Sequence, residues 1–428
     1  MRFFATAAKG TEGALRRELA GLRLAGVRGD RGGVVFEGEL EAGMRACLHA
    51  RTAMRVLLEL ARFPAPSPEA LYDGVRAVAW QDWLTVRTTL AVEATVGSSA
   101  VTHSGFAALK VKDAVVDRLR DALGARPDVD PKDPDVRIVL HLHQDEATLS
   151  LDLAGAPLHR RGYRAAMTEA PLKETLAAAA LLLGQVDPRL PFVDPMAGSG
   201  TLAIEHALRA RRMAPGLGRA FGFQRWPMYR GAPQSAWDRM KGEAAAAALP
   251  RAPAPILARD GHPKAIEALR RNVAAAGLAA DVVVERADAR DLAPIAAEGT
   301  LVSNPPYGER LGGGGRSHDA DRAERLGGGS SRHGSVRPER RRAKRTGVEG
   351  RTSERYEDGD RGDEVVATKK LAGFYRGLAE MLARHAGWSV VLLSGNPLLQ
   401  KAIPLQPEVD HRLWNGPLDV HLLKYRVR

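Results

Sequence analysis

The segment Asn304-Pro305-Pro306-Tyr307-Gly308 carries the most specific chemical signal of the sequence, directly after an apolar run that predicts a buried strand over 300–304. Two prolines stiffen the turn and hold the residue before each of them extended. The side-chain oxygen of Asn304 and the carbonyl of Pro305 then form two acceptors aimed at one point, which suits an –NH2 group on a ring. Tyr307 offers a flat face on which a nucleobase can stack. We predict four catalytic residues: Asn304, Pro305, Pro306 and Tyr307.

A glycine turn, residues 194–201, follows another predicted strand (191–194) and opens a helix. Glycines let the backbone approach a ligand closely, and the helix N-terminus supplies unpaired N–H donors. The turn lacks the Lys-Ser/Thr pair of a phosphate loop, and its leading acid would repel phosphate but suit a positively charged or amine-bearing ligand. We predict contacts to such a ligand from Asp194, Pro195, Ala197, Gly198 and Gly200.

Two further acids follow predicted strands in the same way. Asp260 ends the strand over 255–260, where a carboxylate can accept both hydroxyls of a ribose; the alternative is a cap for the helix predicted over 262–276. Asp288 follows the strand over 282–286 and could accept from an adenine amine or simply cap a turn. We include both among the cofactor-binding residues and leave both alternatives open.

These segments together indicate nucleophilic substitution at a methyl sulfonium. Acceptors at Asn304 and Pro305 favour the amine hydrogens as the nitrogen attacks and becomes positive. Little acid–base chemistry is needed, because positioning supplies much of the barrier reduction.

The elements that must position these residues form an α/β region from about residue 165 to the end. Alternating strands and helices there predict a parallel sheet covered on both faces. Before it, residues 1–62 and 63–164 read as two α+β units, divided by a run of prolines after residue 62. Residues 312–364 are rich in glycine and charge and nearly devoid of apolar residues, so we predict a disordered insert there.

Composition restricts the class of protein further. The 428 residues carry a formal net charge of +12, which favours nucleic acid as a partner, although charge alone leaves a basic protein without such a partner equally open. The single cysteine, Cys47, cannot form an internal disulfide, which fits a cytoplasmic location. Residues 1–10 lack the apolar core of a secretory signal, and no apolar run reaches the roughly 18 residues that a membrane span needs. We expect neither a membrane nor a metal partner.

The motifs as they stand resemble those of class I methyltransferases, whose cofactor is S-adenosyl-L-methionine. Asp-Pro-x-x-Gly-Ser-Gly-Thr from Asp194 is similar to the cofactor motif, and Asn-Pro-Pro-Tyr from Asn304 to the amino-substrate motif. The second motif also occurs in DNA adenine and protein glutamine methyltransferases, so it indicates the reaction better than the substrate.

The rest of the chain resembles THUMP-containing RNA guanine-N2 methyltransferases, and most closely the bacterial 23S rRNA enzymes of the L type. The resemblance covers nearly the whole chain except 312–364 and is carried by residues 106–115, 161–164, 170–177, 213–217, 221–226, 304–311 and 415–419. It implies a ferredoxin-like subdomain over 1–62, a THUMP RNA-binding domain over 63–164 and a class I, Rossmann-like methyltransferase domain over 165–428. Some relatives carry a second methyltransferase domain; because this chain stops at Arg428, we expect one activity.

The resemblance implies methylation of the exocyclic N2 amine of a guanine in 23S rRNA. A tRNA guanine-N2 methyltransferase, a DNA adenine-N6 methyltransferase and a non-enzymatic RNA-binding assembly factor are the alternatives, in that order. Basic side chains of the N-terminal module and the junction are the candidate RNA contacts: Lys110, Lys112, Arg160, Arg161 and Arg164.

Overall fold

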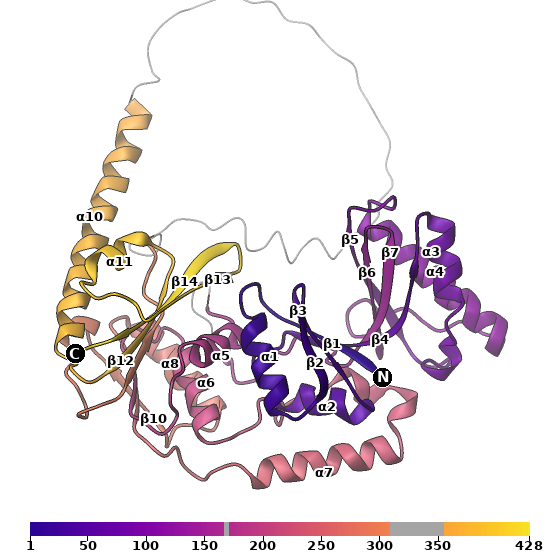
Figure 1. Cartoon of the computed structure of the whole chain (residues 1–428), viewed down its shortest axis with the longest axis horizontal. Coiled ribbons are helices and arrows are strands. Elements are labelled where there is room, and N and C mark those ends of the chain that lie inside the picture. The colour runs from indigo at the N-terminus through magenta and orange to yellow at the C-terminus, as the bar shows by residue number, and fades with distance from the viewer. Residues whose placement is uncertain (167–170, 309–354) are drawn as a thin grey trace, which may run out of the picture. The chain divides into compact units, whose positions relative to one another are not determined.

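The computed structural model describes residues 1–166, 171–308 and 355–428 (Figure 1). Most of the predicted insert, 312–354, lies outside these residues. Its last part, 355–364, was predicted wrongly as disordered, because the helix α10 (Arg355–Ala383) begins there. The chain forms two compact units: the first comprises Met1–Pro305, Glu380–Gly395 and Pro404–Arg428, and the second Pro306–Ala379 and Asn396–Ile403.

The N-terminal part of the first unit is built on one sheet with the strand order β2-β3-β1-β4-β7-β6-β5. Helices alternate with these strands along the chain. The elements are β1 (Arg2–Thr6), α1 (Glu12–Gly21), β2 (Ala25–Asp30), β3 (Gly33–Glu37), α2 (Leu40–His49), β4 (Arg55–Pro64), α3 (Pro68–Arg76), η1 (Trp80–Asp82), β5 (Leu90–Gly97), α4 (Ser104–Leu123), β6 (Val136–His143) and β7 (Glu146–Asp152).

Strand β4 belongs to both of the predicted α+β units. Its residues 55–59 pair with β1, and residues 57–64 pair with β7 on the other side, with a register irregularity between Glu59 and Ala61. The predicted boundary between residues 62 and 63 therefore falls inside a strand. The prolines that suggested it end β4 at Pro64 and supply Pro68 to the first turn of α3, where a missing N–H costs nothing.

The C-terminal part of the first unit is an α/β layer with the strand order β10-β9-β8-β11-β12-β14-β13. Its elements are α5 (Glu174–Leu183), β8 (Phe192–Asp194), α6 (Thr201–Ala210), η2 (Gly222–Arg225), η3 (Pro227–Tyr229), α7 (Ala232–Ala246), β9 (Ile256–Asp260), α8 (Pro263–Ala275), β10 (Val282–Arg286), η4 (Ala289–Asp291), β11 (Thr300–Ser303), β12 (Ser389–Ser394), β13 (Val409–Asn415) and β14 (Leu418–Arg426). The second unit contains most of α10 and the short helix α11 (Pro397–Ala402).

Strands β10, β9, β8, β11 and β12 run parallel, whereas β14 and β13 run antiparallel at the edge. This arrangement confirms the predicted α/β class. The two antiparallel strands form a hairpin at Asn415-Gly416, a residue pair typical of tight hairpin turns, and Gly416 has the positive φ of +62° that such a turn requires. Among the described residues, no helix is long and apolar enough to cross a membrane.

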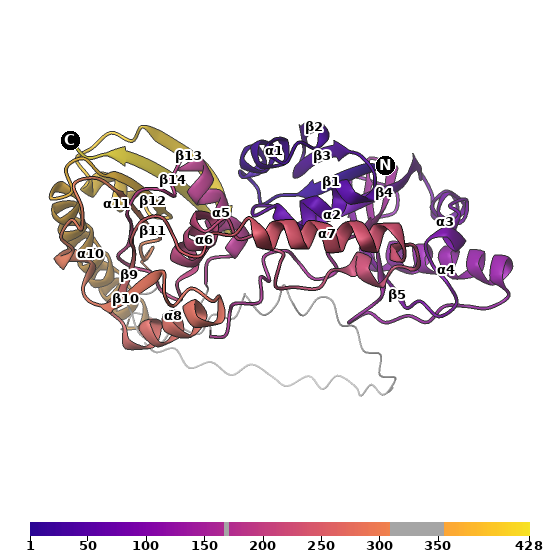
Figure 2. The same cartoon turned by 90° about the horizontal axis from the view of Figure 1, so that it is seen from below.

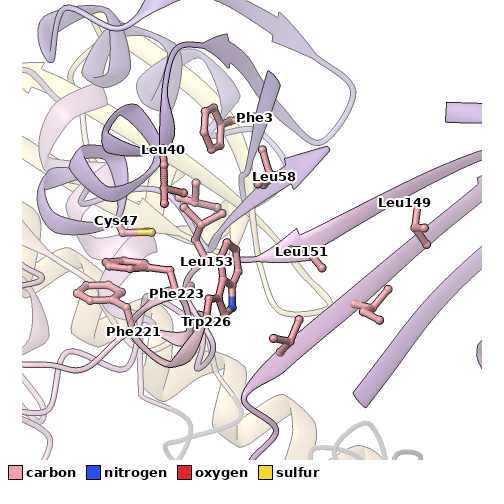
Figure 3. Packing of buried hydrophobic residues seen from close by; sticks show 14 of the residues in the cluster. Phe3, Leu40, Cys47, Leu58, Leu149, Leu151, Leu153, Phe221, Phe223 and Trp226 are labelled. Atoms are coloured by element: carbon pink, nitrogen blue, oxygen red, sulfur yellow. The ribbon is translucent and has the colours of Figure 1, made fainter. Parts of the chain in front are cut away.

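The segment between α6 and β9 packs into the core of the N-terminal sheet. Figure 3 shows Phe221, Phe223 and Trp226 of this segment beside Leu153 and Cys47, and Figure 2 shows α7 running alongside α2. Burial raises the pKa of the Cys47 thiol well above its ordinary value. Cys47 is therefore a core residue, and the connection between α6 and β9 contributes its aromatic side chains to the core of the N-terminal sheet.

Trp237 on α7 is one of two tryptophans of this connection and is 1% exposed. Its ring meets those of Phe221 and Phe223 edge-on, at centroid distances of 5.4 and 5.0 Å. Trp237→Ala should lower the free energy of unfolding by about 3–5 kcal/mol, the usual cost of removing a buried aromatic ring. Arg239→Ala, an exposed change on the same helix, should stay within about 0.5 kcal/mol of wild type in the same denaturant titration. Equal effects of the two changes would contradict this role for α7.

Candidate active site

The predicted chemical residues of the first unit lie at one edge of the parallel sheet. In β8, β9, β10 and β11 the carboxyl ends of the strands point the same way, with Asp194 opposite Ala258 and Asp260 opposite Arg286. Ligands of open α/β sheets bind at this edge. The prediction that these residues share a site therefore agrees with the strand order.

Asp194 ends β8 and is 1% exposed. Its Oδ1 accepts from the backbone N–H of Met196 at 3.2 Å and from the hydroxyl of Ser303 at 2.9 Å. Burial raises the pKa of this carboxyl to about 7, to which the charge of Asp260 adds, while the two hydrogen bonds act in the opposite sense. A positively charged ligand would therefore stabilise the ionised form of this buried carboxyl group.

The glycine loop after Asp194 is shaped by two residues with positive φ. Gly200 has a φ of +90°, and a Cβ there would stand 2.2 Å from Cδ1 of Leu269, so a side chain would be strained by the backbone conformation and would displace Leu269. Gly198 has a φ of +55°, and a Cβ there would meet only open space. The positive φ, and not a neighbouring atom, is what favours glycine at position 198. The space beside its backbone is therefore open to a ligand.

The neighbours of these glycines complete the loop. Pro195 and Ala197 are buried, and the Ala197 N–H donates to the carbonyl of Arg259 at 2.8 Å. The Gly200 N–H in turn donates to the Ala197 carbonyl at 2.8 Å. The loop is thereby tied to the end of β9.

Asp260 joins the glycine loop to the start of α8. One carboxylate oxygen accepts from the Gly198 N–H at 2.9 Å and the other from the His262 N–H at 2.8 Å. His262, not Asp260, is the N-cap residue of α8, so simple capping does not describe Asp260. Each carboxylate oxygen can accept a further hydrogen bond, which leaves the ribose role as a prediction.

Asp288 caps the short helix η4. Its carboxylate accepts from the Arg290 N–H at 2.9 Å and is paired with the Arg290 guanidinium at 2.6 Å. These bonds lower the pKa of Asp288 to about 2. The structure therefore shows Asp288 in the capping role. Its contact with an adenine amine stays a prediction.

The Asn-Pro-Pro-Tyr motif begins where β11 ends. Asn304 is half-buried and Pro305 is buried, both in the first unit. Ser303, the last residue of β11 and fully buried, is the donor to Asp194. The structure therefore ties the residue preceding Asn304 to the residue that begins the glycine loop, a link that sequence reasoning missed because a strand serine gives no signal of its own.

Within the second unit, two side chains hold the backbone of the motif's second half. The Tyr375 hydroxyl of α10 donates to the Pro306 carbonyl at 2.6 Å, and the Asn396 amide donates to the Tyr307 carbonyl at 2.9 Å. Burial raises the pKa of Tyr375 to about 12, so its hydroxyl stays a donor. Sequence reasoning missed both side chains, which lie some 70 to 90 residues further along the chain.

Three of the predicted RNA contacts lie where such a contact is feasible. The Lys110 amine lies 5.8 Å from the ring centre of the exposed Phe106, and Lys112 pairs with Asp113 at 2.6 Å. Arg160 is exposed. These roles stay predictions.

Arg161 is placed differently from the prediction, in the interior. It is 7% exposed, donates to the Leu158 carbonyl at 2.6 Å and to the Arg51 carbonyl, and lies 3.5 Å from the buried Glu205. A guanidinium enclosed in this way has no surface to offer a phosphate, so we remove Arg161 from the RNA contacts. Arg164 is also drawn inward, onto Glu174 and the glycine loop.

The site has the chemistry that S-adenosylmethionine requires. The buried carboxyl of Asp194 suits a cationic group, the open side of Gly198 suits close approach, and Asp260 has acceptor capacity left for hydroxyls. Among the described residues, no group of three or more His, Cys, Asp or Glu side chains is arranged to hold a metal ion.

Comparison with known families agrees with this geometry. Residues 2–57 match the RlmL ferredoxin-like domain, residues 65–152 the THUMP domain, and residues 161–320 the RMKL-like methyltransferase domain. The three matches together indicate similarity to THUMP-domain proteins with an RMKL-like methyltransferase domain. The predicted cofactor, S-adenosylmethionine, is the one this class of domain uses.

One relative is a Syntrophotalea carbinolica protein named ribosomal RNA large subunit methyltransferase K/L, which is 40% identical over 440 residues, covering 100% of this chain and 54% of the relative. The chain spans about half the length of the curated relatives it matches. The predicted resemblance to THUMP-containing rRNA methyltransferases is thus confirmed at the level of domains, whereas guanine-N2 specificity and a single activity stay predictions.

Two solved structures are similar over the whole chain. SMU.472, described as a methyltransferase complexed with S-adenosylhomocysteine, is 27% identical with a TM-score of 0.80 and covers 100% of this chain and 98% of its own. A Listeria monocytogenes protein described as a predicted N6-adenine-specific DNA methylase is also 27% identical, with a TM-score of 0.78 and coverage of 100% and 96%. Both confirm the fold that the sequence predicts.

The raised pKa of Asp194 has a consequence for stability. The folded protein binds this proton more tightly than the unfolded chain, where an Asp has its ordinary pKa of about 3.9. The resulting stabilisation is fully present below about pH 4 and is lost as the pH rises through about 7.

The variant Asp194→Asn tests this pH dependence. Its amide oxygen can accept both hydrogen bonds that the Oδ1 of Asp194 accepts. The melting temperature of the variant relative to wild type should therefore rise between about pH 5 and pH 8. Parallel melting curves across this range would show that Asp194 ionises normally.

Proposed function

We propose that this protein uses S-adenosylmethionine to methylate the exocyclic N2 amine of a guanine in 23S rRNA. One observation carries the proposal: the buried bond between Ser303 and Asp194 holds the start of the glycine loop next to the residue that precedes Asn304. The proposed site for a cationic methyl donor and the proposed acceptors for an amine would then lie at the ends of the neighbouring strands β8 and β11.

The chain's own residues in this mechanism bind and orient. S-adenosylmethionine supplies an electrophilic methyl group on a sulfonium. Asp194 and Asp260 provide the negative charge and acceptors that suit a cationic, ribose-bearing ligand, with Gly198 leaving room for it. Asn304 and the Pro305 carbonyl accept the hydrogens of the target amine, which directs its lone pair and stabilises the positive charge that develops on nitrogen.

Tyr307 is proposed to stack on the target base. Its backbone is held through Asn396, and that of Pro306 through Tyr375, so the ring is carried by a segment with little freedom to move. A guanine amine paired in a duplex cannot reach such a pocket, so the nucleotide must be unpaired or flipped out.

RNA is the proposed substrate because of the N-terminal module. A THUMP domain spans residues 65–152, the net charge is +12, and the relative described above is named for ribosomal RNA. A protein module cannot read the deep major groove of A-form RNA, so it recognises shape and phosphates. Lys110, Lys112 and Arg160 remain the proposed phosphate contacts.

Two enzyme alternatives and one non-enzymatic alternative make different predictions. A tRNA guanine-N2 methyltransferase would use the same site with another RNA. A DNA adenine methyltransferase is favoured only by the shared Asn-Pro-Pro-Tyr motif and by the description of the Listeria neighbour. An RNA-binding assembly factor would need no such site; the bond between Gly198 and Asp260 and the presence of Asn304 after β11 support an enzyme instead.

Asn304→Ala tests the proposed chemistry. Because Asn304 contacts the reacting amine, turnover should fall on the order of 10²-fold, as when one oxyanion donor is removed. The affinity for S-adenosylhomocysteine, measured by calorimetry, should stay close to wild type. Single-turnover methyl transfer at wild-type rate would show that the amine is not held by Asn304.

The substrate is tested by tritiated methyl transfer to protein-free 23S rRNA, assembled large subunits, tRNA and duplex DNA, followed by nucleoside analysis. We expect N2-methylguanosine from protein-free 23S rRNA, with binding that weakens steeply as salt rises because counterions are released. Label confined to tRNA would support the first alternative, and N6-methyladenine in DNA would contradict the RNA assignment. Reactions without protein are the control for background transfer, and Asn304→Ala should label each RNA on the order of 10²-fold more slowly than wild type.

A further inference from the structure

Arg164 lies against the glycine loop, and its side chain is 16% exposed. Its guanidinium donates to the Ser199 hydroxyl at 3.5 Å and to the Thr201 hydroxyl at 3.3 Å. On its other side it donates to a carboxylate oxygen of Glu174 at 2.9 Å and to the Leu172 carbonyl at 3.0 Å. Four partners converge on this one side chain.

This placement is unusual for a cation. Helix α6 begins at Thr201, and a positive charge near a helix N-terminus is unfavourable. The pairing with Glu174, itself 3% exposed, offsets that cost. Stabilisation of α6 therefore does not explain why the Arg164 guanidinium lies there. Its hydrogen bonds to the hydroxyls of Ser199 and Thr201 do explain that position.

Asn272 on α8 holds the same loop through its backbone. It is fully buried, and its amide nitrogen donates to the Ser199 carbonyl at 2.9 Å and to the Ala166 carbonyl at 3.0 Å. Its side-chain oxygen accepts from the Ala166 N–H at 2.9 Å. Ser199 is therefore held on both sides, its hydroxyl by Arg164 and its carbonyl by Asn272.

The loop needs such support because of its composition. Ser199 lies between Gly198 and Gly200, both at positive φ, and glycines lose the most conformational freedom when a loop is ordered. The side of Gly198 open to a ligand has no packing to keep it in place. A loop fixed in advance binds its ligand without a further ordering cost.

We propose that Arg164 and Asn272 are positioning residues for the cofactor, which fix Ser199 and so preorganise the glycine loop. The proposal rests on the cofactor of the proposed function and is independent of which RNA is methylated. It replaces the prediction that Arg164 contacts RNA.

Arg164→Lys tests this role in the full chain. Lysine keeps the positive charge beside Glu174, but its single ammonium group cannot replace the planar fork that reaches several acceptors. The dissociation constant of S-adenosylhomocysteine, measured by calorimetry, should rise by about tenfold or more, the scale of losing hydrogen bonds to a charged group. The affinity for RNA and its dependence on salt should not change.

Arg211→Lys is the matched control. Arg211 is 17% exposed, pairs with the buried Asp281 at 3.2 Å and donates to the Leu249 carbonyl at 2.9 Å, so it resembles Arg164 but bonds no residue of the loop. Both lysine variants should lose similar thermal stability, and only Arg164→Lys should lose cofactor affinity. Ser199→Ala should weaken cofactor binding in wild type and add little in the Arg164→Lys background.

Three outcomes would overturn the proposal. Unchanged cofactor affinity in Arg164→Lys, with stability lost as in the control, would make Arg164 a purely structural residue. Weaker RNA binding with a smaller salt dependence would restore the RNA contact predicted from sequence. Full additivity of Ser199→Ala and Arg164→Lys would show that they act separately. If wild type itself does not bind S-adenosylhomocysteine, it is the proposed function that fails.

Discussion

The buried carboxyl of Asp194 is the point on which the site depends. It accepts from Ser303, so the last residue of β11 and the last residue of β8 are joined by a hydrogen bond that water cannot replace. Low local dielectric makes such a bond strong when satisfied and makes its loss costly. In the proposed mechanism the cofactor loop follows Asp194 and the amine acceptors follow Ser303, so this bond would set the spacing between them.

Sequence patterns predicted the parts of this site that are local. The positions of β8, β9, β10 and β11 followed from short apolar runs, and the glycine turn and Asn-Pro-Pro-Tyr from their residue types. Residues whose roles depend on distant partners were not predictable in the same way. Arg161 and Arg164 were predicted as surface cations, but they pair with the buried Glu205 and Glu174. Strand β4 is shared by the two predicted units, which the sequence of one strand does not reveal because it does not show which strands pair with it.

The aromatic connection between α6 and β9 packs into the core of the N-terminal sheet. Phe223 and Trp237 are as deeply buried as the residues of either sheet. A recognition module packed in this way can transmit its binding energy to a site it does not touch, because contacts far from the reacting atoms fix the substrate's position. If the two parts were joined by a flexible linker, ordering them on binding would cost conformational entropy and reduce the binding energy available.

The net charge of the whole chain is positive, whereas the residues at the edge of the parallel sheet are acidic. The whole chain carries +12, which attracts the phosphates of RNA over long distances, whereas the strand edge presents Asp194, Asp260 and Asp288. Acidic groups at that edge repel phosphate at short range and suit a cationic donor. An RNA drawn to the protein by its backbone can therefore enter the site only through an uncharged group, such as the amine of a base turned out of its stack. Under the proposed function, the acids that suit the methyl donor would also help to select the part of the nucleotide that reaches it.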